Sequence, residues 1–274
     1  MSKQLGIIGG GVMGEALLSR LVDQEIYSPE GIIVSDPQST RCDYLNQLYG
    51  VGVTSDNAAV ISDSKAVLLA IKPQVFDRVI ADLRSAIADR EPGDRSNQVV
   101  LSILAGMPLS RLESAFPNQP VVRAMPNTPA TIGVGVTAIA PGQYATESHL
   151  KLAKRIFEAV GAVVEVPEYQ MDAVTGLSGS GPGYVAVAIE ALIDGGVAAG
   201  LSRAIATQLA IQTVRGTAEL LQTSGLHPAE LKDRVTSPGG TTIAGIASLE
   251  QAGFRSALIE AVKTACRRSQ ELGN

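Results

Sequence analysis

The sequence predicts an α/β fold with a doubly wound parallel sheet in its first part and an all-helical second part. Short apolar runs alternate with helical patterns from residue 5 to residue 166, which is typical of a parallel sheet covered by helices on both faces. A glycine cluster separates the first apolar run from the first helical pattern. After Pro167 nearly every pattern is helical.

The predicted elements of the first part follow one another with short connections. The first strand, Leu5–Ile8, leads into a helix that runs to about Gln24. Further strands are expected at 32–35, 51–54, 66–71, 99–104, 121–124, 134–140 and 162–166. Helices are expected at 40–49, from a cap at Ser55 or Asp56 through 61, and at 75–88, 108–115 and 146–160, with a polar loop at 90–97. The run at 66–71 is apolar throughout, as expected for a strand buried on both faces.

The glycine cluster has the spacing G-x-G-x-x-G at Gly9, Gly11 and Gly14. In this spacing the first glycine permits a tight turn, the second lets the backbone approach a pyrophosphate, and the third lets the helix pack on the sheet. The free N–H groups at the start of the helix favour phosphate binding. Because the motif follows a strand and opens a helix, it predicts a dinucleotide-binding domain of the Rossmann type.

In such a domain the cofactor lies across the carboxyl ends of the strands. The loops expected there contain Asp36, Asn57, residues 70–73 and residues 105–106. Lys72 follows the fourth strand and is either a contact to the cofactor or a solvated lysine.

The composition argues against several classes of partner. The net charge is −5 and no long basic block is present, which argues against nucleic-acid binding. Cys42 and Cys266 form neither a metal-ligand cluster nor a disulfide framework, so free thiols in a reducing compartment are expected. With only His149 and His227 and no Cys/His cluster, no metal site is expected.

Two further patterns bear on location. The chain leads almost directly into a strand, so no signal or transit peptide is expected. Glu190 and Asp194 interrupt the most apolar helical stretch, Tyr184–Leu201, so no membrane span is expected. Such an apolar helix is more often buried in a core or an interface.

The second part is predicted to consist of helices at 171–176, 182–200, 202–223, 228–235, 241–252 and 254–272. Helices rich in Ala, Gly and Leu pack closely, and dimerisation is a natural use for them. We therefore divide the chain into a dinucleotide-binding domain, 1–167, and a helical substrate and dimerisation domain, 168–274.

The first glycine-rich stretch of the helical part is LSGSGPGY, residues 177–184. Pro182 fits the first turn of a helix. The glycines let the backbone approach a ligand or another chain, and a simple turn between helices is the alternative.

The second glycine-rich stretch is TSPGGTT, residues 236–242. Ser237 is expected to cap a helix that begins at Pro238 and runs to Ala252. The glycines at 239–240 leave N–H groups uncovered and the threonines at 241–242 add hydroxyls, which predicts a small anion site suited to a carboxylate. Ordinary capping explains Ser237 and Pro238, but not the residues that follow them.

At these residues the chain resembles the Δ1-pyrroline-5-carboxylate reductase family over essentially its whole length. The segments that carry the resemblance are IGGGVMGEAL (8–17), AIKPQ (70–74), RAMPNTPA (123–130), DAVTGLSGSGPGY (172–184) and LKDRVTSPGGTTIAGI (231–246). The last two are far more specific than the dinucleotide motif.

The resemblance implies that the cyclic imine of 1-pyrroline-5-carboxylate is reduced to L-proline with NADPH or NADH, the last step of proline biosynthesis. It implies a cytoplasmic homodimer that the helical domain interlocks, with dimers often assembled into decamers. The substrate is implied to lie between the nicotinamide and the turn at 237–242.

The resemblance also assigns residues. Its substrate-carboxylate positions are Ser237, Gly239, Gly240, Thr241 and Thr242, and Thr242 is the position proposed to hydrogen-bond the imine nitrogen. Its cofactor positions are Ile8, Gly9, Gly10, Gly11, Val12, Met13, Asn57, Ala70, Ile71, Lys72, Pro73 and Ala105.

Asp36 departs from the family pattern, because members that use NADPH often have Ser or Thr there. An acidic residue at this point can bind the ribose 2′-OH of NADH and would meet a 2′-phosphate as a like charge. Against this, Pro37 would turn the carboxylate outward, and Ser35, Ser39 and Arg41 offer hydrogen bonds and one positive charge to a phosphate. We expect use of both cofactors, with their ranking open.

Two other functions are compatible with parts of the sequence. A β-hydroxyacid-type dehydrogenase has a similar layout, but needs a catalytic lysine at the start of the long interdomain helix, and residues 177–184 contain none. A non-catalytic NAD(P)-binding scaffold is distinguished from the reductase by the absence of turnover.

Overall fold

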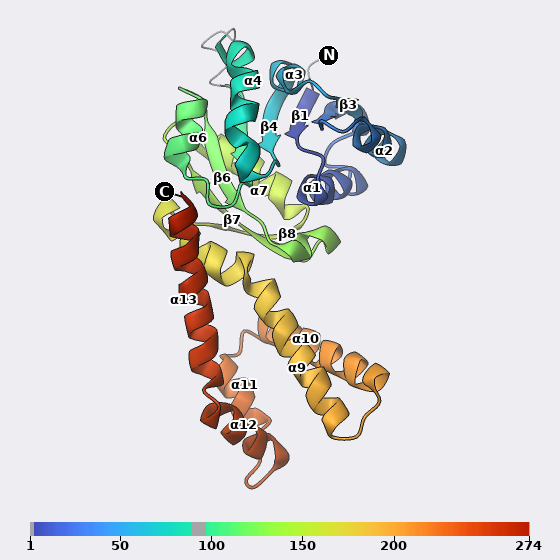
Figure 1. Cartoon of the computed structure of the whole chain (residues 1–274), viewed down its shortest axis with the longest axis vertical. Helices are drawn as coiled ribbons and strands as arrows, with labels where there is room; N and C mark the ends of the chain where they lie inside the picture. Colours follow the sequence, from blue (N-terminus) through green and yellow to red (C-terminus); the bar gives the residue numbers. More distant parts are fainter. Residues whose placement is uncertain (1–2, 89–96, 274) are drawn as a thin grey trace. The chain divides into compact units, whose positions relative to one another are not determined.

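The computed structural model describes residues 3–88 and 97–273, shown in Figure 1. The chain forms two compact units: the first reaches Ser180 and includes the residues from Ala265 onward, and the second spans Gly181–Thr264. The polar loop expected at 90–97 lies almost entirely outside the described residues. Within the described ranges, no helix combines the length and apolar character needed to cross a membrane.

The first unit is built on an eight-stranded sheet with the order β3-β2-β1-β4-β5-β6-β7-β8. Its strands are β1 (Lys3–Ile8), β2 (Ile32–Ser35), β3 (Gly52–Thr54), β4 (Ser64–Leu69), β5 (Val99–Ser102), β6 (Val121–Met125), β7 (Gly135–Pro141) and β8 (Gly161–Glu165). All neighbours pair in parallel except β6 and β7. The order 3-2-1-4-5-6 is that of a Rossmann-type sheet, so the doubly wound α/β prediction is confirmed.

The antiparallel pairing of β7 follows from a short connection. Only residues 126–134 join β6 to β7, and they contain a single short helical turn, Thr128–Ile132. A parallel neighbour needs a crossover of a dozen or more residues, usually a helix. The strand therefore returns beside β6, with Ala124 opposite Ile139.

Helices cover both faces of the sheet (Figure 1). One face carries α1 (Val12–Asp23), α2 (Ser39–Tyr49) and α7 (Glu147–Glu158), and the other carries α3 (Asn57–Asp63), α4 (Phe76–Ala88) and α6 (Leu109–Ala115). Each set of helices has its own cluster of buried apolar side chains.

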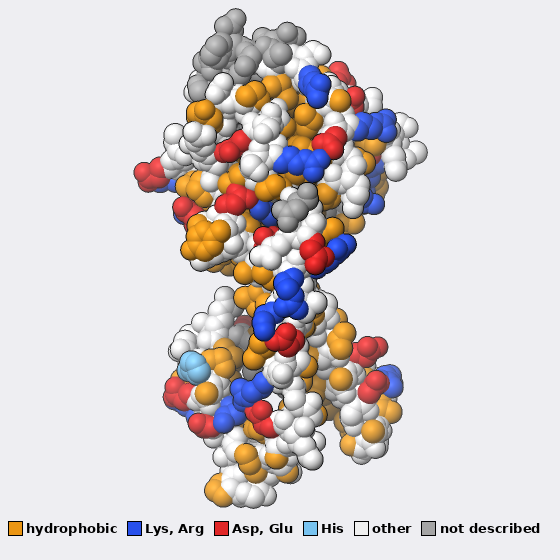
Figure 2. Space-filling model, turned by 60° about the vertical axis from the view of Figure 1, so that its left-hand side comes forward, with side chains coloured by type: hydrophobic (Ala, Val, Ile, Leu, Met, Phe, Trp, Pro, Cys, Tyr) orange, Lys and Arg blue, Asp and Glu red, His pale blue; other side chains and the backbone are white. Residues whose placement is uncertain are grey.

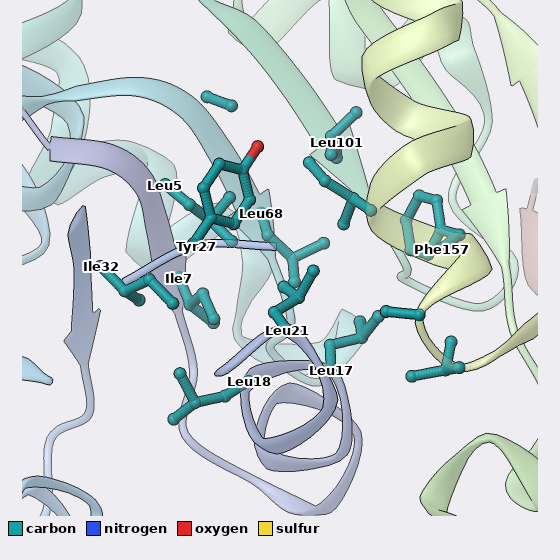
Figure 3. Close-up of a cluster of buried hydrophobic side chains, with 14 of the residues drawn as sticks. Leu5, Ile7, Leu17, Leu18, Leu21, Tyr27, Ile32, Leu68, Leu101 and Phe157 are labelled. Carbon is teal, nitrogen blue, oxygen red and sulfur yellow. The ribbon is translucent and has the colours of Figure 1, made fainter. Parts of the chain in front are cut away.

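Successive side chains of one strand enter opposite clusters. On β1, Leu5 and Ile7 lie in the cluster under α1, whereas Ile8 lies in the cluster under α4. Figure 3 shows Leu17 and Leu21 of α1 in the first of these clusters. Both leucines are fully buried, and such burial contributes about 1.5–3 kcal/mol for each side chain. Because both faces are covered, the central strands contain continuous apolar runs, such as residues 66–69 of β4.

Polar side chains cap the starts of α3 and α7 in this unit. Asp56, rather than Ser55, caps α3, and its carboxylate accepts a hydrogen bond from the Ala58 N–H at 2.8 Å. At α7, Thr146 and His149 form a reciprocal capping box in which the Thr146 N–H donates to His149 Nδ1 at 3.1 Å. Capping α7 is thus the structural role of His149.

We expect His149 to make the folded protein less stable as the pH falls below neutrality. Burial lowers the pKa of His149, so below the ordinary value of about 6.5 the unfolded chain takes up this proton before the folded chain does. The stabilising contribution is thus present above pH 6.5 and is lost as the pH falls through the folded-state value.

Melting temperatures of wild type and His149→Gln at pH 7.5 and pH 5.5 test this. Glutamine also completes a capping box but does not titrate, so the wild type should lose more stability than the variant. Equal losses would contradict the prediction.

The junction between sheet and helices contains a short α-helix, α8 (Met171–Val174), followed by a π-helical turn, Thr175–Gly179. The Ser180 N–H donates to the Thr175 carbonyl at 2.9 Å. Pro182 is the second residue of the next helix, as its position in a first helical turn predicts. The stretch 177–184 thus joins the end of a π-helical turn to the first turn of an α-helix, with a bend at Ser180 between them.

The packing of this junction extends the first unit beyond Pro167. Met171 is fully buried, and Glu168 binds Arg123 of β6 with an N–O distance of 2.6 Å. Near the end of the chain, Ser269 donates to the Asp172 carboxylate at 2.6 Å. These contacts describe packing, and the functional boundary at Pro167 stays a prediction.

The helices from residue 181 onward are α9 (Gly181–Ala198), α10 (Arg203–Ser224), α11 (Pro228–Arg234), α12 (Thr241–Gln251) and α13 (Phe254–Gly273), of which the end of α13 belongs to the first unit. Asp194 of α9 pairs with Arg203 of α10. No residue of α9 is fully buried, and Val187 is 66% exposed. Figure 2 shows hydrophobic side chains on the surface of these helices.

Candidate functional site

The turn between β1 and α1 is shaped by its glycines. Gly9 has φ +106°, a left-handed conformation that glycine adopts without strain. A Cβ atom on Gly14 would lie 2.2 Å from the Gly9 carbonyl oxygen, so only glycine allows the helix this close to the turn. No protein atom lies within 4 Å of the corresponding position on Gly11, which leaves space above the turn for a phosphate.

The start of α1 is open to an anion. Gly11 is its N-cap residue and supplies no side-chain cap, so the first N–H groups of the helix have no side-chain partner. Val12, the first helical residue, is 73% exposed. Unpaired N–H groups and the positive end of the helix dipole favour phosphate at this point.

Asp36 and Arg41 hold this turn from the side of β2. The Gly10 N–H donates to Asp36 Oδ2 at 3.1 Å, and Arg41 Nε donates to the Gly10 carbonyl at 2.6 Å. Asp36 also accepts from the Gln38 N–H at 3.0 Å. The Asp36 carboxylate therefore faces the glycine turn. Pro37 does not turn it outward, which was one of the reasons given for binding of a 2′-phosphate.

Two of the three groups expected to hold a phosphate, Ser35 and Arg41, already have protein partners. The Ser35 hydroxyl donates to Asn57 Oδ1 at 2.7 Å, and Arg41 is paired with Glu15 of α1. Asn57, the first residue of α3, is thus fixed by a side chain at the end of β2.

A pocket of about 220 Å³ lies at the carboxyl ends of the strands. Its lining residues are Ile8, Gly9, Ser35, Pro37, Ser55, Asn57, Ile71, Val75, Arg78, Val79 and Asp82. The predicted cofactor residues Ile8, Gly9, Asn57 and Ile71 are among them. Their assignment to a cofactor stays a prediction.

One side of this pocket, formed by α4 and the residue before it, was not predicted from the sequence. Arg78, Val79 and Asp82 of α4, with Val75 just before it, recur at intervals of three and four, which is typical of one face of a helix. That helix follows the AIKPQ segment closely in the sequence. The spacing of these four residues could therefore have predicted that they line the cofactor pocket.

The other predicted cofactor residues occupy the edges of the same region. Gly10, Gly11, Val12 and Met13 form the turn and the start of α1, and Ala70, Lys72 and Pro73 follow β4. Lys72 is exposed and precedes the short turn Pro73–Val75. Ala105 is exposed beyond the end of β5.

The SPGG segment of the helical unit differs from the expected cap. The Gly240 N–H donates to the Ser237 carbonyl at 3.0 Å and Gly239 has φ +67°. Pro at the second position and Gly with positive φ at the third are typical of a type II turn. The prediction that Ser237 caps the helix and Pro238 begins it is therefore wrong, because the left-handed backbone of Gly239 interrupts the helix at this point. The helix predicted at 241–252 agrees with α12 to within one residue.

The true start of α12 is more open than the prediction implied. Its N-cap is Gly240, which has no side chain to bond the first N–H groups, and its first two residues are Thr241 and Thr242. Thr242 is half-buried and Thr241 is exposed. Uncapped N–H groups and two hydroxyls in one helical turn suit a carboxylate.

Other candidate groups serve structural roles. His227 caps α11 by accepting a hydrogen bond from the Ala229 N–H at 3.2 Å, and Cys42 and Cys266 are free thiols. Among the residues that the structure describes, no three His, Cys, Asp or Glu side chains gather as metal ligands.

Two family models match parts of this chain. Residues 168–272 match the model described as pyrroline-5-carboxylate reductase dimerisation. Residues 4–106 match the model described as NADP oxidoreductase, coenzyme F420-dependent.

Similar proteins match over the full length. A pyrroline-5-carboxylate reductase from Synechocystis is 59% identical over 273 residues, covering 100% of this chain and 99% of the relative. The structure of a pyrroline-5-carboxylate reductase from Coxiella burnetii has a TM-score of 0.91 at 31% identity and full coverage of both chains. That of a Plasmodium falciparum pyrroline carboxylate reductase with NADP bound has a TM-score of 0.86 at 30% identity, covering 99% and 98%. This chain therefore belongs to the pyrroline-5-carboxylate reductase family.

Proposed function

We propose that this protein reduces 1-pyrroline-5-carboxylate to L-proline with NADPH or NADH, as the last step of proline biosynthesis in the cytoplasm. The observation that carries the proposal is the full-length identity of 59% to the Synechocystis reductase. The open glycine turn and the uncapped start of α12 support it, since the reaction needs one site for a dinucleotide and one for a carboxylate. The free cysteines suit a reducing compartment.

The reduction adds a hydride to the imine carbon and a proton to the imine nitrogen. The reduced nicotinamide, when bound, supplies the hydride and is left oxidised. The residues proposed to hold it are those of the glycine turn, together with Asn57, residues 70–73 and Ala105. Asp36 is proposed to approach the ribose.

The helical unit is proposed to hold the substrate. The N–H groups at the start of α12 bind the carboxylate, aided by the helix dipole. Thr242 hydrogen-bonds the imine nitrogen and either donates its proton, replaced from water, or holds a substrate that enters as the iminium ion. No strong acid or base is required, and the main contribution of the protein is to position two reactants and exclude water.

The direct test measures proline formed from 1-pyrroline-5-carboxylate with each reduced cofactor. Proline formation coupled to oxidation of NADPH or NADH is expected. Tight nucleotide binding without any proline would instead favour the non-catalytic scaffold.

We expect Asp36→Ser to raise the ratio of kcat/KM for NADPH to that for NADH by about tenfold, because a carboxylate beside a 2′-phosphate is a like-charge contact that opposes binding. Steady-state kinetics with both cofactors measure this ratio. Asp43→Ser, the same substitution at an exposed position of α2, serves as control and should leave it unchanged. An unchanged ratio in Asp36→Ser would show that Asp36 does not face the ribose.

We propose that the helical unit forms a homodimer and that five dimers assemble into a decamer. The support is the match to the dimerisation model and the exposure of large apolar side chains such as Leu192 and Leu209, which are 54% and 53% exposed. Exposed apolar surface of this extent marks an interface.

Sedimentation at micromolar concentration is expected to give at least a dimer. Val187→Asp on α9 should shift the protein toward monomer, whereas Val134→Asp, at a position of equal exposure in the first unit, should not. A monomeric wild type would refute the proposed dimer, and a dimer that forms no larger species would refute the decamer alone.

A further inference from the structure

Arg41 lies beside the glycine turn, but its charge is directed into the protein. Its Nε donates to the Gly10 carbonyl at 2.6 Å, and its guanidinium also hydrogen-bonds the Glu15 carboxylate. The guanidinium carbon lies 4.9 Å from the centre of the Tyr44 ring. The side chains of Arg41 and Glu15 are only 25% and 23% exposed, so solvent screens this pair less than a surface ion pair.

Glu15 is held in its charged form. Burial by itself would raise the pKa of Glu15, but the hydrogen bonds from Arg41 and Tyr49 and the positive charge of Arg41 lower it below its ordinary value. The Tyr49 hydroxyl donates to Glu15 Oε1 at 3.0 Å. Burial, followed by the hydrogen bond to Glu15 and its charge, raises the pKa of Tyr49 to about 12. At neutral pH the network thus contains a carboxylate, a guanidinium and a neutral phenol.

Gly10 links this network to Asp36 through hydrogen bonds of its backbone. Gly10 donates its N–H to Asp36 at 3.1 Å and accepts from Arg41 at its carbonyl. In a dinucleotide-binding turn, the acidic residue at the end of the second strand lies beside the ribose 2′ position. Arg41 is therefore a cation adjacent to that position, and Glu15 is the group that pairs with it.

We propose that Glu15 is a specificity-determining residue that weakens the preference for a 2′-phosphorylated cofactor by pairing with Arg41. With Glu15 ionised, the 2′ position faces two carboxylates and one guanidinium, and a phosphate gains little from Arg41. Without that charge, Arg41 is free to bind the phosphate through charge-assisted hydrogen bonds. This inference rests on the proposed cofactor site, but not on the reaction catalysed.

The test measures binding of two nucleotide fragments by calorimetry: adenosine 2′,5′-bisphosphate and 5′-AMP, which differ only in the 2′-phosphate. In Glu15→Gln, which keeps the shape of Glu15 but removes its charge, the affinity for the bisphosphate should rise about tenfold relative to 5′-AMP. The affinity for 5′-AMP itself should stay unchanged. The gain should shrink at high salt, because it is electrostatic.

Two further variants make the test specific. Tyr49→Phe removes a hydrogen bond from Glu15 but keeps both charges, so the ratio of the two affinities should not change. The double variant Glu15→Gln with Arg41→Met should lose the gain, because the gain acts through Arg41. Arg41→Met alone leaves the Glu15 and Asp36 carboxylates without their counter-charge, so it should weaken the bisphosphate more than 5′-AMP, which tests the idea even where Glu15→Gln folds poorly.

Several results would overturn the inference. These are an unchanged ratio in folded Glu15→Gln, a gain that persists without Arg41, or an equal weakening of both fragments in Arg41→Met. Failure of wild type to bind either fragment would overturn it together with the cofactor site. Normal fragment binding without proline formation would overturn only the proposed function.

Discussion

Replacing Thr242 with alanine should lower kcat/KM for the imine substrate by about 10- to 150-fold, because loss of one hydrogen bond to a charged or developing group costs about 1.5–3 kcal/mol. The affinity for the reduced cofactor should stay near that of wild type, since Thr242 belongs to the helical unit and the glycine turn to the other. Steady-state kinetics and fluorescence titration of NADPH measure the two quantities.

Two variants separate a catalytic from a structural effect of Thr242. Thr242→Ser keeps the hydroxyl and should recover most of the activity. Thr217→Ala removes a hydroxyl that bonds the Thr213 carbonyl within α10, and it should leave kcat/KM unchanged. Full activity of Thr242→Ala would remove Thr242 from the site, and a parallel loss of cofactor binding would indicate misfolding instead.

Replacing Gly14 with alanine should abolish measurable nucleotide binding and also lower the free energy of unfolding by about 1–3 kcal/mol, the usual cost of overpacking. The added methyl group would lie 2.2 Å from the Gly9 carbonyl oxygen, so α1 must move away from the turn that presents its N–H groups. Chemical denaturation and NADPH titration of the variant measure the two effects.

Gly11→Ala is the matched control. Gly11 has φ −69°, which alanine adopts readily, and no protein atom lies within 4 Å of the new methyl position. We expect normal stability and weakened nucleotide binding, because the methyl group fills the space above the turn. If Gly11→Ala bound NADPH as well as wild type does, the phosphate would not lie over this turn.

Local pattern alone determined much of this protein. The strands at 32–35 and 121–124 and the helix at 40–49 were predicted to within one residue of their observed bounds, because each is a short apolar or amphipathic run between strong breakers. The glycine spacing predicted a turn that only glycine can form at 9 and 14. The family followed from segments distributed over the whole chain, and the full-length relatives confirm it.

The tertiary structure decided what depends on partners distant in the sequence. Glu15 and Arg41 are 26 residues apart and their pairing needs α1 and α2 to pack side by side, so no spacing rule reveals it. The same holds for Ser35 with Asn57 and for the α4 side of the pocket. The residues Ser237 and Pro238 are compatible with either a helix cap or a type II turn. The structure contains the turn, because Gly239 has a positive φ. Patterns in sequence report local preference, whereas the charge available to a ligand depends on which side chains the fold has already paired.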